Sequence, residues 1–274
     1  MVPQDLFADR SLSQRLERAE GEANRRFVEA RARVSPERQA AWIEAGGAYA
    51  MYDGVDSPLT QTFGLGMFEP VTGAQLGRIE AFFAERGAPI FHEVSPLADA
   101  SVLQVLPAAG YAPLEFSTVL YQPLPRMAPP GPITDVRVRL SQPADRQTWA
   151  RASAAGWSEF PELEAFMLEF GQVAAAAEGA LPFLAELDGH IVATASMVIH
   201  EGIALLAGAS TVPHARRRGA QAALLAARLA DAIARGCDVA MMVAQPGSGS
   251  QRNAERNGFR VAYTRLKWTR VSGA

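Results

Sequence analysis

Three consecutive arginines, Arg216 to Arg218, stand directly before Gly219 and a long segment rich in alanine and leucine. Residues 203–208 upstream are apolar, so the succession predicts a strand, a tight loop and a helix. The first N–H groups of a helix lack an intrahelical acceptor, and the peptide dipoles place about half a positive charge there. Glycine lets a ligand lie against the main chain. These residues predict an anion site, and the three guanidinium groups favour a diphosphate over a carboxylate.

A solvated arginine turn is the alternative interpretation of the same residues. Arginines at a helix start oppose the helix dipole, which costs a few tenths of a kcal/mol each unless an anion is bound. A sequence adapted only for helix stability would carry Asp or Glu in that turn. The anion site is therefore preferred.

The segment from Val212 to Gln221 resembles the acyl-CoA loop of the GNAT superfamily of N-acyltransferases. The family pattern is Arg or Gln, two residues, Gly, one residue, and then Gly or Ala. Arg216 and Gly219 match this pattern, whereas Gln221 replaces the small residue. Its longer side chain either crowds the diphosphate or points away while its backbone N–H still binds.

The resemblance extends from about Val136 to the C-terminus and includes Gly258-Phe259 before the last expected strand. It implies acetyl-CoA or CoA as the cofactor, with the pantetheine arm between the strand before the loop and the strand after its helix. The residues that it assigns to the cofactor are Thr211, Val212, Arg216, Arg217, Arg218, Gly219, Ala220, Gln221, Ser250 and Asn253. Helix capping is an equally weighted alternative for Ser248 or Ser250.

The resemblance implies attack of a neutral primary amine, from a small molecule or a protein, on the thioester carbonyl. The site must then accept a proton and direct a donor at the oxyanion, for which the N–H near Val212 is the candidate. Many family members carry a carboxylate on the strand before the loop, but residues 203–212 contain none. Asn253-Ala254 occupies the place where many carry a tyrosine.

Glu159 is the remaining candidate for the catalytic base. It lies between Trp157 and Phe160 in an expected loop between two helices, where burial would raise its pKa. An ordinary exposed loop glutamate is the alternative. A protein that binds CoA or acyl-CoA without turnover is therefore the second hypothesis beside the N-acetyltransferase, and a site for another phosphorylated ligand is the third.

The expected fold is α/β (α+β), with two GNAT-like domains that each hold a mostly antiparallel central sheet flanked by helices. Short similar words, such as Gly73-Ala74-Gln75 and Gly219-Ala220-Gln221, recur at a nearly constant offset. This offset predicts a duplication, although short words also repeat by chance. The expected elements are helices at 11–33, 36–45, 73–86, 98–109, 141–155, 162–178, 219–235 and 251–257, and strands at 48–52, 60–67, 89–94, 114–122, 136–140, 182–187, 191–200, 203–212, 238–244 and 258–271.

The expected domains are residues 1–124, a proline-rich linker at 125–135, and the cofactor-binding residues 136–274. Pro123 to Asp135 contains five prolines, which exclude regular structure. Where the second half has its arginines, the first has Pro70-Val71-Thr72 before Gly73. The first domain is therefore expected to be a degenerate copy that no longer binds the cofactor.

Composition excludes several classes of function. The formal net charge of −3 gives no general attraction for nucleic acid, and no apolar run of about 18 residues predicts a membrane span. Residues 1–10 lack the features of a secretory signal, so a cytoplasmic location is expected. The single cysteine, Cys237, reads as a core residue, and the four histidines are too scattered for a metal site. The oligomeric state is not predicted.

Overall fold

The computed structural model describes residues 6–127 and 134–271. The chain divides into two compact units: a central unit, Pro123–Ala240, and a terminal unit, Asp5–Gln122 with Met241–Ala274. The break after Gln122 lies close to the expected domain end at 124. The sequence boundaries placed residues 241–274 with 136–240, whereas in the structure they pack with the first half. Residues 128–133 of the expected linker lie outside the described residues.

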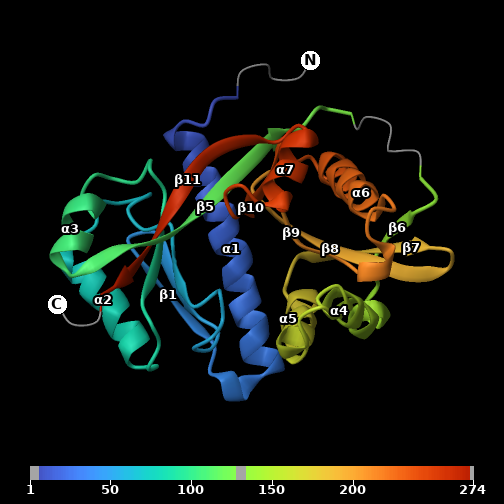
Figure 1. The fold of residues 1–274 in the computed structure, drawn as a ribbon. Helices are drawn as coiled ribbons and strands as arrows, with labels where there is room; N and C mark the ends of the chain where they lie inside the picture. The colour runs from blue at the N-terminus through green and yellow to red at the C-terminus, as the bar shows by residue number, and fades with distance from the viewer. Residues whose placement is uncertain (1–5, 128–133, 272–274) are drawn as a thin grey trace. The chain divides into compact units, whose positions relative to one another are not determined.

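The terminal unit contains most of the first half and the last helix and strand (Figure 1). Its sheet has the order β1-β2-β3-β4-β11-β5, in which only the β3–β4 pair is parallel. The final strand β11 thus lies between two strands of the first half. The elements are α1 (Arg10–Val34), a 3₁₀ turn at Pro36–Arg38, β1 (Ala41–Ala45), β2 (Ala48–Tyr52), β3 (Gln61–Phe63), α2 (Gly73–Ala84), β4 (Phe91–Val94), α3 (Val102–Ala108), β5 (Tyr111–Pro123), α7 (Gly249–Arg256) and β11 (Arg260–Arg270).

Alternation along β2 shows how this sheet is covered on both faces. Tyr49 and Met51 pack with Val28 of α1, whereas Ala48 and Ala50 belong to a second cluster that includes residues of α2 and α3. Successive side chains of a strand point to opposite faces. Helix α1 therefore covers one face, and α2 and α3 cover the other.

In the central unit, neighbouring strands pair antiparallel in the order β9-β8-β7-β6. Helices α4 and α5 lie on one face of these strands and α6 lies on the other (Figure 1). The fully buried Trp149 of α4 donates from Nε1 to the Phe183 carbonyl at 3.0 Å. The elements are β6 (Arg137–Leu140), α4 (Arg146–Ala155), α5 (Glu164–Ala176), β7 (Ala180–Leu187), β8 (His190–His200), β9 (Ile203–Thr211), α6 (Ala220–Ala234) and β10 (Val239–Ala244), which continues into the terminal unit.

Most expected elements are present, and both halves share the order of three strands, helix, strand, helix and strand. The helix expected at 36–45 is wrong, because the chain forms only the 3₁₀ turn there before β1. Gln39 adopts a left-handed conformation with φ of 52°, which stops the helical turn. Gly46 and Gly47, at φ of 57° and 75°, make the tight turn into β2 instead of ending a helix. None of the described helices combines the length and the apolar composition that a bilayer-spanning segment needs.

His92 of β4 is completely buried, and neither of its ring nitrogens has a hydrogen-bond partner among the described residues. Its ring packs against that of Tyr111, with 4.8 Å between centroids. Burial lowers the pKa of His92 from 6.5 to about 3. The unfolded chain therefore binds a proton near pH 6.5 that the folded chain excludes until near pH 3.

We expect His92 to make the protein less stable as the pH falls through this window. Its contribution should lower the free energy of unfolding by about 2 kcal/mol between pH 7.5 and pH 5. The apolar variant His92→Leu should lose that part of the pH dependence. Urea unfolding of both proteins at the two pH values measures it, and parallel losses of stability in both would refute the assignment.

Candidate acyl-CoA site

Strand β9 carries a β-bulge before the arginine loop. Thr194 pairs with Ser210 and Ser196 pairs with Ala207, so two residues of β9, Gly208 and Ala209, lie opposite one residue of β8. Gly208 has a φ of +60°, which is the left-handed conformation that glycine adopts at such bulges. The residues at this bulge are exposed, unlike those in the first part of β9.

The arginine loop ends with a helix start that has free donors. Arg217 and Gly219 both have positive φ, at 65° and 85°, and α6 begins at Ala220. Gly219 is the N-cap, and no side chain caps the helix. In the described part of the chain, the amides from Arg217 to Gln221 meet no protein acceptor. Alternating left-handed residues and an uncapped helix start form a concave set of N–H donors, which suits an anion.

The structure settles how Gln221 fits the loop. Its side-chain Nε2 donates to Thr211 Oγ1 at 2.6 Å, so the side chain turns back onto the end of β9. It therefore does not lie across the N–H groups of the helix start. Gln221, which stands where the family pattern has Gly or Ala, therefore joins the arginine loop to β9 and leaves the N–H groups of the helix start open.

Val212 is placed differently from the prediction. Its N–H donates to the Val192 carbonyl at 3.0 Å, and its own carbonyl accepts from the Ala215 N–H at 3.0 Å. The N–H of Val212 is thus already used within the protein and is not free to face an oxyanion. Strand groups alternate in direction, so the main chain of Thr211 faces away from β8, where its carbonyl accepts from Arg216 Nε at 3.4 Å.

The three arginines have different surroundings. Arg216 donates through all three guanidinium nitrogens: to the Thr211 carbonyl at 3.4 Å, to the Gly156 carbonyl at 3.0 Å and to the Glu159 carboxylate. Arg218 pairs with Asp188 at 3.2 Å. Arg217 is exposed, and its guanidinium has no acceptor within the described ranges. Arg217 is therefore the cation of the loop that is free to meet a phosphate.

Glu159 lacks the burial on which its prediction as a base depends. Its side chain is 52% exposed and pairs with Arg216, while Trp157 and Phe160 are 38% and 49% exposed. The aromatic rings lie near each other, with centroids 6.5 Å apart, but they do not enclose the carboxylate. The alternative of an exposed loop glutamate is the one that the structure supports, with an ion pair added to it.

The C-terminal end of α4 packs closely against the C-terminal end of β9. A Cβ on Gly156 would lie 1.8 Å from Ser210 Oγ and 3.1 Å from the Thr211 nitrogen. The Ser210 hydroxyl donates to the Ser153 carbonyl at 2.8 Å. The missing side chain of Gly156 permits this close approach, which places the α4–α5 connection next to the arginine loop.

Sequence reasoning missed Arg228, a buried arginine in α6. Its Nη1 donates to the Ser196 carbonyl at 3.2 Å, next to the bulge, and its Nε donates to Leu224. Burial lowers its pKa to about 10. A single arginine on the apolar face of an Ala- and Leu-rich helix was the signal that could have revealed it.

Ser250 and Asn253 lie on α7, which belongs to the terminal unit. The cap of α7 is Ser248, whose hydroxyl accepts from the Gln251 N–H at 3.2 Å. Both Ser250 and Asn253 are exposed, and Ser250 is not needed as a cap. Their contact with the cofactor stays a prediction.

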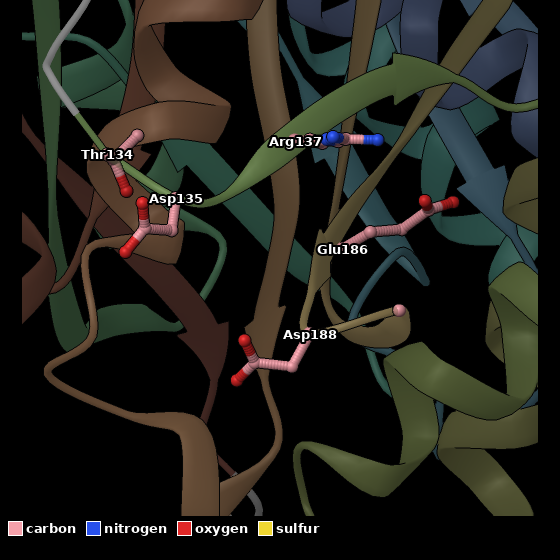
Figure 2. Close-up of a pocket in the computed structure, with 6 residues that line it drawn as sticks. Thr134, Asp135, Arg137, Glu186 and Asp188 are labelled. Atoms are coloured by element: carbon pink, nitrogen blue, oxygen red, sulfur yellow. The ribbon is translucent and has the colours of Figure 1, made fainter.

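A pocket of about 650 Å³ opens in the central unit beside the β7–β8 turn (Figure 2). Three of the residues that line it are acidic, and Figure 2 shows their carboxylate groups. Carboxylates repel phosphate groups, so this pocket does not suit a diphosphate. The lining residues are Thr134, Asp135, Arg137, Glu186, Asp188 and Gly189.

Comparison with known proteins agrees with this geometry. Residues 146–259, from the start of α4 to the start of the last strand, match the acetyltransferase (GNAT) family. This stretch is a GNAT-family domain. The match confirms the resemblance inferred from the arginine loop, and it includes the loop, Glu159 and α7. No curated protein matches the sequence significantly.

Solved structures extend the likeness beyond the GNAT-family domain to nearly the whole chain. A GCN5-related N-acetyltransferase from Kribbella flavida has a TM-score of 0.59 at 20% identity, covering 89% of this chain and 95% of its own. A tandem GNAT protein from the clavulanic acid biosynthesis pathway has a TM-score of 0.59 at 13% identity, covering 96% of both chains. At these identities the likeness concerns the fold, and it supports the predicted architecture of two GNAT-like domains.

Proposed function

We propose that this protein is an acetyl-CoA-dependent N-acetyltransferase that acts on a primary amine of a small molecule or a protein. The observation that carries the proposal is the row of open N–H donors from Arg217 to Gln221 within a GNAT-family domain. That family generally uses acetyl-CoA, and a diphosphate matches both the charge and the donor pattern of this helix start.

The described residues fit the coenzyme in the following way. The N–H groups at Gly219 and the start of α6 would hold the diphosphate, and the free guanidinium of Arg217 would add charge. The N–H of Thr211, which faces away from β8, would bind the pantetheine arm. Acetyl-CoA supplies the acyl thioester. Ser250 and Asn253 remain candidates for further contacts with the arm.

Two steps of the reaction need groups from this chain. Because the N–H of Val212 already donates to Val192, we assign the oxyanion donor to an N–H of the bulge at Gly208-Ala209. There β9 is exposed, and its residues no longer pair one to one with those of β8. The amine must also lose a proton. Glu159 is the candidate base from the sequence, but its ion pair with Arg216 favours water as the first acceptor of the proton.

A protein that binds CoA without turnover is the second candidate. It is favoured by the absence of a carboxylate between Ile203 and Val212 and by the exposed, paired state of Glu159. Orientation of the amine against the thioester and an oxyanion donor supply much of the rate of such reactions, so the enzyme is preferred.

Thiol release from acetyl-CoA over a panel of amines, together with calorimetry of CoA binding, tests the proposal. We expect CoA to bind and at least one amine class to release thiol at a rate above the amine-free control. Binding of CoA with no release for any amine would support the second candidate. Failure to bind CoA would reject both and direct attention to other phosphorylated ligands.

A further inference from the structure

The guanidinium of Arg216 joins the arginine loop to the α4–α5 connection, residues 156–163. Arg216 reaches the Gly156 carbonyl at the C-terminal end of α4 and the Glu159 carboxylate within the connection, while its Nε reaches back to Thr211. Three protein acceptors thus occupy the three nitrogens. Its neighbour Arg217 has no such acceptors in the described part of the chain.

We propose that Arg216 is a positioning residue that holds the α4–α5 connection, with its exposed Trp157 and Phe160, in place for the acceptor amine. This inference rests on the proposed function. Arg216 acts through Glu159 and Gly156, and the charge that meets the diphosphate comes from Arg217 and the main chain. Glu159 is then the anchor of the connection and is not the base.

The electrostatics of α4 favour this position for a cation. A helix C-terminus carries partial negative charge, and the Gly156 carbonyl belongs to the residue that caps α4. The carboxylate of Glu159 adds a full negative charge at the same guanidinium. Hydrogen bonds between charged groups are shorter and stronger than those between neutral groups.

The α4–α5 connection makes few other polar contacts with the rest of the described chain. The N–H of Trp157 donates to the Ala154 carbonyl in the last turn of α4, and the N–H of Phe160 donates to the Trp157 carbonyl. In the described ranges, the Glu159–Arg216 pair is the one polar side-chain tie from residues 157–160 to another element. Without the Glu159–Arg216 pair, the side chains of Trp157 and Phe160 would become more mobile, whereas α4 would stay packed against β9 at Gly156.

The pair contributes little to global stability. The side chains of Arg216 and Glu159 are 43% and 52% exposed, and exposed ion pairs add little because water screens them. Variants of either residue should therefore fold, and their effects should appear in acceptor binding. This separation makes the proposal testable by a double-mutant cycle.

The cycle consists of Arg216→Gln, Glu159→Gln and the double variant, with Arg217→Gln as the matched loop control. We expect each member of the pair to raise the acceptor KM about five-fold, with no further rise in the double variant. The pH profile of kcat should keep its shape in Glu159→Gln. Arg217→Gln should weaken CoA binding more than Arg216→Gln does.

A second measurement needs no turnover. The four tryptophans, replaced by 5-fluorotryptophan, give separate ¹⁹F resonances, and Trp157→Phe identifies the one from the connection. Arg216→Gln and Glu159→Gln should each shift and narrow that resonance, whereas Arg217→Gln should leave it unchanged. The exchanged pair, Arg216→Glu with Glu159→Arg, should restore it towards the wild-type position.

The outcomes distinguish the positioning role of Arg216 from the proposed function of the protein. Additive effects on KM, an unmoved Trp157 resonance, or a loss of CoA affinity in Arg216→Gln that equals the loss in Arg217→Gln would overturn the positioning role. A collapse of kcat in Glu159→Gln with loss of one limb of its pH profile would make Glu159 the base. Absence of thiol release by the wild-type protein would instead reject the proposed function, and the fluorine measurement would still decide the role of Arg216.

Discussion

Gly219→Glu abolishes the binding of CoA, because it places a carboxylate at the helix start where the diphosphate would lie. We expect the affinity to fall by about 100-fold or more, which corresponds to about 2.7 kcal/mol. The carboxylate repels the phosphates and also competes for the N–H groups of the helix, as an acidic cap does. Calorimetric titration of CoA into wild-type and variant protein measures the loss.

Gly219→Gln is the matched control for the backbone. Gly219 has a φ of +85°, so any side chain costs about 1–2 kcal/mol in conformational strain. The amide variant carries the same strain and nearly the same shape without the charge. It should keep the greater part of the CoA affinity, and circular dichroism should show both variants folded. Equal affinities for the wild-type protein and Gly219→Glu would exclude the loop as the diphosphate site.

Arg265→Met destabilises the protein by about 3–5 kcal/mol at pH 7, because it leaves buried carboxylates without their cation. Arg265 of β11 is 1% exposed and lies 2.6 Å from Glu20, 3.4 Å from Glu17 and 3.5 Å from Glu93. Burial raises the pKa of Glu17, and Arg265 opposes this rise. Urea denaturation measures the free energy of unfolding.

Two further variants identify the cause. Arg260→Met removes an exposed arginine from the same strand and should change the stability by less than about 0.5 kcal/mol. The pair Glu17→Gln with Arg265→Met should recover part of the loss, since it also removes one of the stranded charges. A stability of Arg265→Met equal to that of Arg260→Met would show that the buried cluster does not depend on its cation.

Local patterns of the sequence were sufficient to predict the elements around the site. A glycine inside a strand is typical of a bulge, and the structure has one at Gly208. An Asp-Gly pair is typical of a tight hairpin turn, and Asp188-Gly189 joins β7 to β8. The uncapped helix start at Gly219 followed from the residue types alone. These features depend on a few neighbouring residues, so periodicity and turn chemistry determine them.

Features that join distant segments could not be predicted. The pairing of Glu159 with Arg216 depends on how closely Gly156 approaches β9, and no local pattern reports that distance. The alternation along β11 predicts which residues face the core, but it does not name the neighbouring strands β4 and β5. For this reason the sequence placed residues 241–274 with the second half.

A crystal structure of the protein soaked with CoA tests the central claim most directly. We expect the diphosphate oxygens to accept hydrogen bonds from the N–H groups between Arg217 and Gln221, with the Arg217 side chain against them and Arg216 still paired with Glu159. A diphosphate bound at the first-half segment before Gly73, or elsewhere away from Gly219, would contradict it.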